Sequence, residues 1–305
     1  GAGLDTRSVA DLMDELRLDS TARSLAEADV RAEYGVEADA LSLLFHVSLT
    51  ALTDNLDPGD IERFRIRGGS DRLPAAFAED LGRALVLRAP VTAVRTRGDT
   101  VRVIAGGERF EADRCVVAAP LPAVRAIEFD PPLPRRARDA IASIQYGDVV
   151  KTALQYDTRF WRTEGWDGDT LTQLPIQATW EATDAQDGKA GVLMACTAGA
   201  GAAKVGAAAA PDRIRSAVDQ VDTIYRGSAR HFDVGASVAW GREPYSGGSY
   251  SAWAPGQYAR LWPVLRRPYG RIWFAGEHTD VYASYMEGAV RSGRRVATAV
   301  AAAGA

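Results

Sequence analysis

The sequence is poor in cysteine and histidine and nearly balanced in charge. Its 305 residues include two cysteines, Cys115 and Cys196, too few for a disulfide framework or a cysteine-based metal cluster. The three histidines have no acidic or cysteine partners at ligand spacing, so we expect no metal site. Lys and Arg number 36 against 40 Asp and Glu, and the resulting net charge of −4 disfavours a dedicated nucleic-acid-binding protein.

Long apolar stretches are also missing. No apolar run approaches the roughly 18 residues of a membrane-spanning helix, and the first residues lack the charged and then apolar pattern of a secretory signal. We therefore expect a cytoplasmic protein without a membrane partner. The 47% hydrophobic and 25% charged residues suit a globular protein, and the length suits two domains at roughly 150 residues each.

Two common catalytic signatures are absent. The serines at 246, 249 and 251 do not lie in a Gly-x-Ser-x-Gly elbow, so a hydrolase triad has no support. The segment from Gly199 to Gly201 lacks the third glycine and the later acidic residue of a dinucleotide fingerprint. We interpret it as a loop.

The hydrophobic pattern predicts alternating helices and strands. Residues 8–35 have helical spacing, and residues 38–52 are apolar enough for a buried helix. Residues 63–66 predict a short strand, which a Gly-Gly turn separates from a helix over 71–85. Short strands then follow over 86–120.

Five stretches, in order, resemble the flavin monoamine oxidases, the family that includes polyamine oxidases and histone demethylases of the amine-oxidase type. The most specific is RIWFAGEHTDVYASYMEGAVRSGRRVA, from Arg271. The others are RIRGGSDRLPAAFAEDLG, APVTAVRTRGDTVRV with DRCVVAAPLP, YGDVVKTALQYDTRFW and WGREPYSGGSYSAWAPG. The resemblance covers nearly the whole chain and implies an α/β (α+β) fold with FAD as cofactor.

The resemblance also implies two interleaved domains. Residues 62–145 and 241–305 would form an FAD-binding domain with an incomplete Rossmann-like part. Residues 1–61 and 146–240 would form a substrate-binding domain with a mixed sheet and helices. The family's βαβ unit with a Gly-rich fingerprint, which holds the ADP half of FAD, is absent from these 305 residues. We expect it as a separate N-terminal chain packed on this one, or as a lost fragment; a cofactor-free relic is the further alternative. A homodimer is a separate expectation for the partners of this chain.

Four C-terminal residues would hold the flavin by resemblance. Gly276 would allow close approach of the cofactor, and Glu277 would hydrogen-bond a hydroxyl of its ribityl–pyrophosphate stretch. The backbone amides that begin the last helix, at Tyr285 and Met286, would face the electron-rich end of the isoalloxazine. The alternative interpretation of this segment is an ordinary strand–helix join punctuated by glycine.

The adenine half would involve two earlier segments. The backbone of Val91 would meet the adenine ring, and the turn of Arg67, Gly68 and Gly69 would lie at the edge of the same region. The alternatives are a core valine and a solvated basic face. Some family members bond the flavin covalently through a cysteine where this chain has Ser249, so we expect FAD to be held non-covalently.

Lys151 is the sharpest catalytic candidate. It is the single charged side chain in an apolar strand-like segment, where burial would be costly unless the charge is used. By resemblance it would hold a water beside flavin N5 and assist reoxidation by oxygen; the alternative is a lysine on the outer face of an edge strand. Tyr250 and Tyr285 match the family's aromatic cage, whose facing rings would guide an amine and favour a cation in transit.

His46, Trp180 and Trp253 are weaker candidates for the substrate pocket, and His46 has the alternative of a satisfied core histidine. The resemblance implies FAD-dependent oxidation of an amine to an imine, by hydride transfer to flavin N5 with reduction of oxygen to hydrogen peroxide. A flavin dehydrogenase or desaturase, and a non-catalytic subunit that needs a separate N-terminal chain, are the alternatives. No acidic cluster clearly marks a polyamine tunnel, and no arginine marks a carboxylate clamp.

Overall fold

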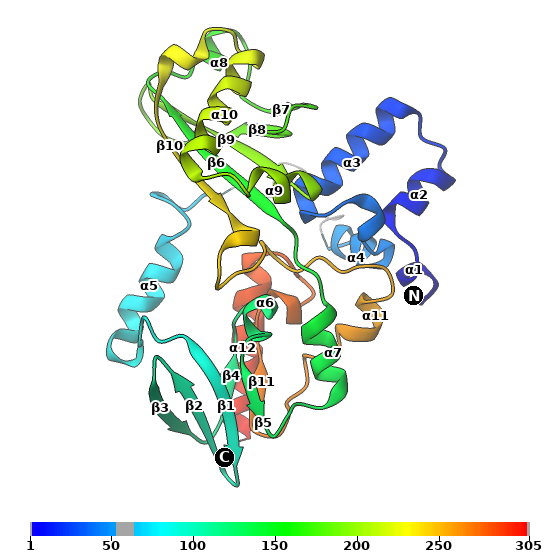
Figure 1. The fold of residues 1–305 in the computed structure, drawn as a ribbon, viewed down its shortest axis with the longest axis vertical. Helices are drawn as coiled ribbons and strands as arrows, with labels where there is room; N and C mark the ends of the chain where they lie inside the picture. Colours follow the sequence, from blue (N-terminus) through cyan, green and yellow to red (C-terminus); the bar gives the residue numbers. More distant parts are fainter. Residues whose placement is uncertain (1, 53–63, 304–305) are drawn as a thin grey trace.

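A computed structural model describes residues 2–52 and 64–303. Figure 1 shows a sheet lobe at the top, which comprises residues 149–239, above a larger lower part that holds both ends of the chain. The lobe contains one antiparallel sheet in the order β10-β6-β9-β8-β7. Its strands are β6 (Val149–Tyr156), β7 (Thr170–Leu171), β8 (Ala178–Glu181), β9 (Gly191–Ala198) and β10 (Phe232–Ala239).

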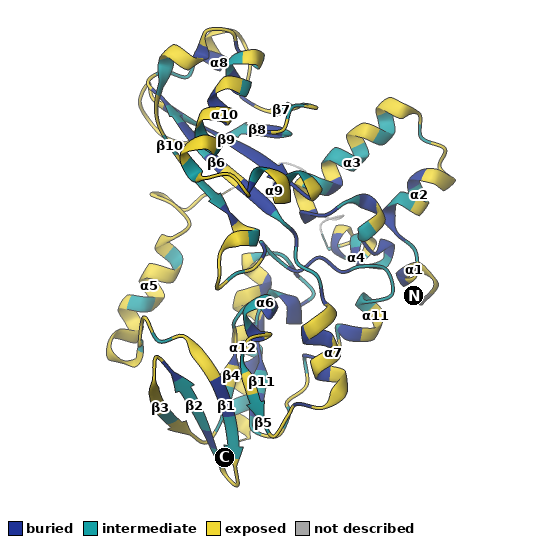
Figure 2. Cartoon of the chain, in the orientation of Figure 1, coloured by how far each residue is buried: buried dark blue, intermediate teal, exposed yellow. Residues whose placement is uncertain are grey.

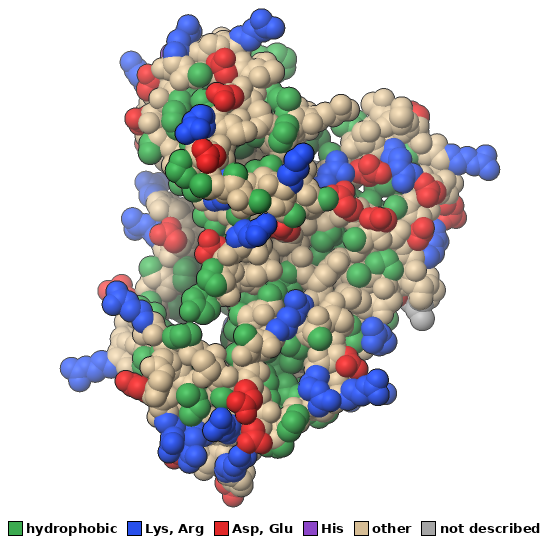
Figure 3. Space-filling view, in the orientation of Figure 1, with side chains coloured by type: hydrophobic (Ala, Val, Ile, Leu, Met, Phe, Trp, Pro, Cys, Tyr) green, Lys and Arg blue, Asp and Glu red, His purple; other side chains and the backbone are tan. Residues whose placement is uncertain are grey.

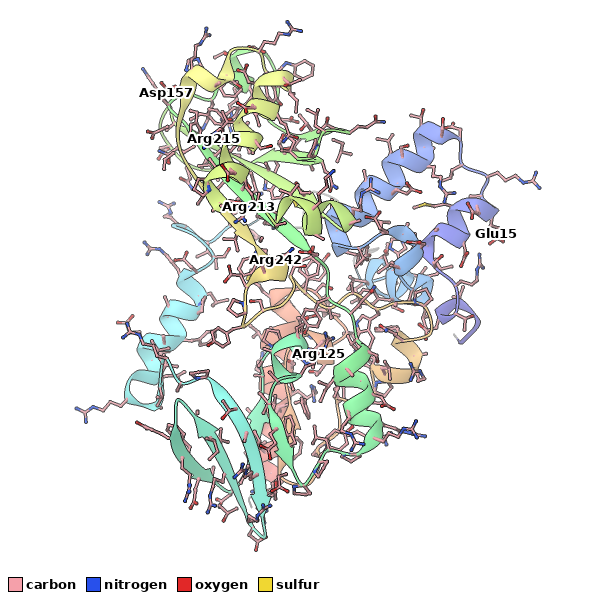
Figure 4. All side chains as sticks on the ribbon, viewed as in Figure 1. Glu15, Arg125, Asp157, Arg213, Arg215 and Arg242 are labelled. Atoms are coloured by element: carbon pink, nitrogen blue, oxygen red, sulfur yellow. The ribbon has the colours of Figure 1, made fainter. Side chains whose placement is uncertain are left out.

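The sheet lobe has its own small core. Helix α10 (Ala210–Ile224) packs across β10 and β6 and buries Ala217, Val218 and Val221. Arg213, labelled in Figure 4, fixes this helix to β10 by donating from Nε to the Ser237 hydroxyl (2.8 Å) and from Nη2 to its carbonyl (3.1 Å). Two short helices, α8 (Phe160–Thr163) and α9 (Ala200–Val205), complete the lobe.

The N-terminal helices confirm the helical prediction for the described part of residues 8–52. They are α1 (Ala2–Asp5), α2 (Val9–Glu15), α3 (Ser20–Tyr34) and α4 (Leu43–Thr50). Ser8 and Asp11 form a reciprocal capping box on α2, and Asp19 caps α3 by accepting from two backbone amides. These caps explain why α2 and α3, which are rich in polar residues, begin where they do.

The lower part combines two sheets with helices around them. One sheet has the strand order β3-β2-β1-β5, in which β1 is antiparallel to β2 and parallel to β5. The other sheet consists of two parallel strands, β11 and β4. The strands are β1 (Val91–Arg97), β2 (Thr100–Ala105), β3 (Glu108–Ala112), β4 (Cys115–Val117), β5 (Glu128–Asp130) and β11 (Ile272–Phe274). The helices are α6 (Leu121–Val124), α7 (Arg135–Ser143), α11 (Tyr258–Leu261) and α12 (Met286–Ala302).

One large core joins the N-terminal helices to the lower part. Its buried side chains come from residues 9–49, 94–144 and 252–296, and Figure 2 shows them in dark blue below the lobe. Burial of apolar surface is the dominant favourable contribution to folding. The hydrophobic packing of residues 9–49 is therefore shared with the lower part more than with the sheet lobe.

The expected division into domains stays a prediction, since it concerns which residues hold FAD and which hold substrate. Its boundary at residues 61–62 lies outside the described residues. The mixed α/β (α+β) fold class is confirmed, and residues distant in sequence meet in the β11-β4 sheet and in the large core.

Helix α5 (Arg72–Leu81) stands apart from the rest of the molecule. It is amphipathic but buries no residue, and Figures 1 and 2 show it as an exposed helix at one side. The predicted strand at 63–66 is wrong over its described residues, because 64–66 pair with no other strand there. The predicted Gly-Gly turn is confirmed: Gly68 and Gly69 have φ of 88° and 112°, which other residues rarely adopt.

Within the described ranges, no helix is long and apolar enough to cross a membrane. The same residues contain no group of three or more His, Cys, Asp and Glu side chains that could hold a metal ion.

Candidate active site

The site is built around a junction of three backbone segments. The Gly35 carbonyl accepts from the Asp148 amide at 2.9 Å, so the end of α3 is fixed beside the start of β6. The Gly147 amide donates to the Tyr250 carbonyl, also at 2.9 Å. Gly35 ends α3 with φ of 67°, and a Cβ there would lie 2.9 Å from the Cα of Gly147. Only residues without side chains allow these segments to approach so closely.

This junction brings Tyr250 and Tyr285 to one carboxylate. The Tyr285 hydroxyl donates to Glu33 Oε1 at 2.6 Å. Tyr285 directly precedes α12, and Glu33 lies in the last turn of α3. Burial, and then the negative charge of Glu33, raises the pKa of the Tyr250 hydroxyl. Both candidate cage residues therefore lie within electrostatic reach of Glu33, which the sequence analysis did not single out.

Lys151 lies on the sheet side of the site. It occupies β6, between β10 and β9, and it pairs with Val238 and Cys196 in these neighbours. Its Nζ lies 5.4 Å from the centroid of the Trp180 ring, within the range of a cation–π interaction. Trp180 is thereby placed beside the candidate catalytic lysine.

Two sequence expectations for Lys151 need correction. Its side chain is exposed rather than buried, and its strand is central rather than at an edge. The exposure follows from the alternation of side chains across a sheet, because Val150 and Thr152 point to the opposite, covered face and are buried. The ammonium therefore needs no buried counter-ion.

Cys196 connects the two sides of the site electrostatically. Burial raises the pKa of its thiol, and the Lys151 charge opposes that shift. Cys196 in turn contributes to the raised pKa of Tyr250. Tyr250 thus interacts with groups on both the sheet side and the α3 side.

His46 packs against Tyr34, the last residue of α3. Its Nδ1 lies 3.0 Å from the Tyr34 hydroxyl, and the two rings meet edge to face. Burial lowers the pKa of His46, with a small opposing effect of Asp29, so the imidazole is neutral near pH 7. Burial and the Glu33 charge raise the pKa of Tyr34. Both side chains are therefore uncharged near pH 7.

Trp253 does not line this site, which corrects the sequence expectation. Its side chain is 0% exposed and lies in the large core against Phe45 and Tyr258. Its backbone carbonyl accepts from the Ser42 amide at 2.7 Å and so fixes the start of α4. Trp253 is a structural residue.

Glu277 holds together the segments that precede α12. Its two carboxylate oxygens accept from the Ser251 amide (3.0 Å), the Ser251 hydroxyl (2.7 Å) and the Ser284 amide (2.6 Å). Burial raises the pKa of Glu277, although these hydrogen bonds oppose the shift. Gly276, with φ of 130°, leads into this residue, and a Cβ there would lie 2.5 Å from the His278 ring.

The start of α12 is suited to a negatively charged or electron-rich group. In the described chain, the side chain of Tyr285, which precedes the helix, makes no capping hydrogen bond to the first amides, and Met286 is exposed. A Cβ at Gly288 would collide with the Tyr282 carbonyl, so the first turn requires glycine. Together with Gly276 and Glu277, this uncapped helix end fits a flavin and its pyrophosphate.

The remaining candidates for the cofactor lie on the surface of the lower part. Val91 begins β1 and is 38% exposed, which excludes the alternative of a core valine. Arg67, Gly68 and Gly69 form an exposed turn before α5. Their contact with FAD stays a prediction.

Gly199 and Gly201 do not form a nucleotide site. Gly199 joins β9 directly to α9, so the expected loop is in part a helix. Glu37 caps the start of α9 by accepting from the Ala200 amide at 3.0 Å, and it would block an anionic ligand there.

The chain matches the family described as flavin containing amine oxidoreductase over residues 8–301. It belongs to this family. FAD is the family's cofactor, and the features around α12 fit it. The family membership confirms the resemblance on which the sequence analysis relied.

Relatives and solved structures agree with this assignment. The protein named "Putative flavin-containing monoamine oxidase AofH" from Mycobacterium tuberculosis is 31% identical over 98% of this chain and 67% of its own length. The flavin-containing amine oxidase of Oncorhynchus mykiss is 29% identical over 97% of this chain and 59% of its own. A structure of putrescine oxidase bound to putrescine has a TM-score of 0.86 and 26% identity, over 98% of this chain and 69% of that one. This chain thus spans about three fifths to two thirds of its relatives.

Glu33, Asp29, Tyr34 and Cys196 are the site residues that the sequence reasoning missed. One signal was available for Glu33. It lies in the last turn of α3, where the helix dipole disfavours a negative charge. An acidic residue at that position indicates a role outside the helix.

Proposed function

We propose that the protein is an FAD-dependent amine oxidase that converts an amine to an imine and oxygen to hydrogen peroxide. Bound FAD would accept a hydride at N5 and pass the electrons to oxygen. The observation that carries the proposal is the hydrogen bond from Tyr285 to Glu33, whose charge also contributes to the raised pKa of Tyr250, together with Lys151 beside the Trp180 ring.

The tyrosines would guide the amine. Aromatic faces attract a cation as it enters and present a flat, apolar passage to the neutral form. Burial keeps both Tyr34 and Tyr250 protonated near pH 7, because the pKa of each is raised. The rings therefore orient the substrate without exchanging a proton with it.

Lys151 would serve the oxygen half of the reaction. We infer that its ammonium holds a water beside the flavin and stabilises negative charge as oxygen is reduced. The exposed side chain beside Trp180 supports this role, because the charge is available to a bound group.

Gly276, Glu277 and the first amides of α12 would hold FAD. The cofactor would be non-covalent, because position 249 is a serine whose hydroxyl donates to the Gly147 carbonyl at 2.9 Å. Met286, exposed at the first turn, would contact the flavin ring.

We infer that further polypeptide completes the FAD-binding half. Large hydrophobic side chains are exposed on and near α5, including Phe77, Leu81 and Leu87. In Figure 3 hydrophobic side chains gather between the sheet lobe and the lower part. Apolar patches of this kind are typical of contact surfaces. A second, N-terminal chain, a homodimer and a cytoplasmic location stay predictions.

The test is reduction of the bound flavin by amines. The FAD-loaded protein is mixed with a panel of primary amines without oxygen, and air is then admitted while peroxide is measured. We expect bleaching of the flavin absorbance by at least one amine, followed by rapid reoxidation with stoichiometric peroxide. Bleaching followed by slow reoxidation would indicate a dehydrogenase instead, and a protein that retains no flavin would indicate a non-catalytic subunit.

A further inference from the structure

His278 has a buried ring nitrogen that pairs with nothing in the described part of the chain. The residue is 2% exposed, and its Nε2 has no hydrogen-bond partner among residues 2–52 and 64–303. Burial lowers the pKa of the imidazole to about 4, so the ring is neutral near pH 7. An unpaired polar group in the interior reduces stability, so the fold alone does not explain this histidine.

The other ring nitrogen of His278 faces the hydroxyl of Tyr146. The Tyr146 oxygen lies 3.2 Å from His278 Nδ1, and it accepts from the Leu121 amide, also at 3.2 Å. A phenol hydroxyl has a single proton to donate. The direction of the bond between Tyr146 and His278 therefore decides whether that proton is available to another acceptor.

The other acceptor is Glu277, which has one acceptor site left after its contacts with neighbouring segments. A carboxylate has about four such sites. Ser251 and Ser284 fill one at Oε1 and two at Oε2. A hydrogen bond from Tyr146 is among the effects that lower the pKa of Glu277 against the larger raise from burial. Tyr146 can thus take the site that a hydroxyl group of FAD would need.

We propose that His278 draws the Tyr146 proton away from Glu277 and so leaves one acceptor site of this carboxylate for a hydroxyl group of FAD. His278 is then a positioning residue, because it acts through Tyr146. The inference rests on the proposed function in taking FAD as the group that Glu277 holds. It also explains the unpaired nitrogen, since a neutral imidazole that accepts at Nδ1 carries its proton on Nε2.

The first experiment titrates FAD into the flavin-free protein and measures the affinity from the change in flavin fluorescence. His278→Leu leaves the Tyr146 proton with Glu277 as its acceptor. We expect FAD affinity to fall roughly 10- to 100-fold, as the loss of a hydrogen bond to a charged group predicts. Tyr146→Phe removes the proton itself and should leave the affinity near the parent value. Combining His278→Leu with Tyr146→Phe should restore the affinity that the first substitution removes.

The matched control is His231→Leu, which removes a histidine that bonds Asp157 at 2.9 Å in the sheet lobe. This variant should bind FAD as the parent protein does. Restoration in the double variant distinguishes the inference from a merely structural role of His278, for which the two substitutions would add their losses. Additive losses, or a His278→Leu protein with parent affinity, would overturn the inference.

The second experiment requires neither FAD nor a folded His278→Leu variant. Nitrogen NMR of the histidine-labelled parent protein shows which ring nitrogen carries the proton. We expect the proton of His278 on Nε2. A proton on Nδ1 would overturn the inference, because His278 would then donate to Tyr146 and the Tyr146 proton would turn to Glu277.

Failure of the proposed function is recognised separately. If no amine reduces the bound flavin, amine oxidation is wrong, and the FAD affinities of the variants still decide the role of His278. A parent protein that binds no FAD would overturn the inference, because Glu277 would then have no cofactor hydroxyl to accept.

Discussion

The two charged candidates of the site, Lys151 and Glu33, are held in different ways. Lys151 projects from a central strand, and hydrogen-bonded neighbours on both sides fix its position. Glu33 projects from the last turn of a helix, and its position depends on where that helix ends. A helix end is less constrained than a central strand, but here Gly35 and Gly147 pack backbone against backbone and fix it. The comparison teaches that a glycine contact can position a side chain as firmly as a sheet does.

The charges of Lys151 and Glu33 also differ in the groups that they face. The lysine faces the Trp180 ring and no acidic partner in the described chain, and the glutamate faces hydroxyl groups and no basic one. We expect the cation to act on oxygen and the anion to act on substrate. Variants on the two sides should therefore affect different half-reactions.

The largest expected effect is on the sheet side. Lys151→Met removes the charge and should slow reoxidation of the reduced flavin by oxygen roughly 100-fold, the typical effect of removing one electrostatic or proton-handling group. FAD content and the rate of reduction by amine should change little. Stopped-flow mixing of the reduced protein with oxygen measures this rate, and Lys204→Met, an exposed lysine on α9, is the matched control. An unchanged reaction with oxygen would remove Lys151 from the mechanism.

The next largest effect is expected for Tyr285, whose hydroxyl donates to Glu33. Tyr285→Ala removes an aromatic face and the hydrogen bond to Glu33. The loss of about one cation–π contact and one hydrogen bond predicts a drop in kcat/KM for amines of roughly tenfold. Reoxidation by oxygen should stay near normal, and flavin absorbance should show that FAD remains bound. Release of FAD would assign Tyr285 a structural role instead.

The sequence predicted the sheet side better than the α3 side. The resemblance named Lys151, Tyr250 and Tyr285, because these residues lie within continuous stretches typical of the family. Glu33 lies outside those stretches, and its contact with Tyr285 joins two helices distant in the chain. Helical periodicity predicts that α3 forms, but it does not specify which element meets each exposed position.

The errors have equally local reasons. Residues 64–66 have the composition of a strand but belong to no strand of the described chain, because β-propensity depends on the tertiary context and composition alone does not specify it. Trp253 is a weaker pocket candidate in the sequence, but it lies three residues after Tyr250, an odd spacing that places the two side chains on opposite sides of an extended segment, and its ring lies in the core. Lys151 was expected to be buried because the segment is apolar, yet only one face of its strand is covered.

The smallest effect tests how far the negative charge of the α3 side extends. Asp29 raises the pKa of His46 against the larger lowering by burial, so Asp29→Asn should lower that pKa further. Titration of the imidazole resonances by NMR measures the shift, with Glu33→Gln as the control that leaves His46 unchanged. Because the folded-state pKa of His46 lies below its unfolded value of about 6.5, the unfolded chain binds the proton first as pH falls. His46 therefore reduces stability below that pH, and Asp29→Asn should deepen the loss. A pKa of His46 that does not move would show that the negative charge of Asp29 does not extend to the imidazole.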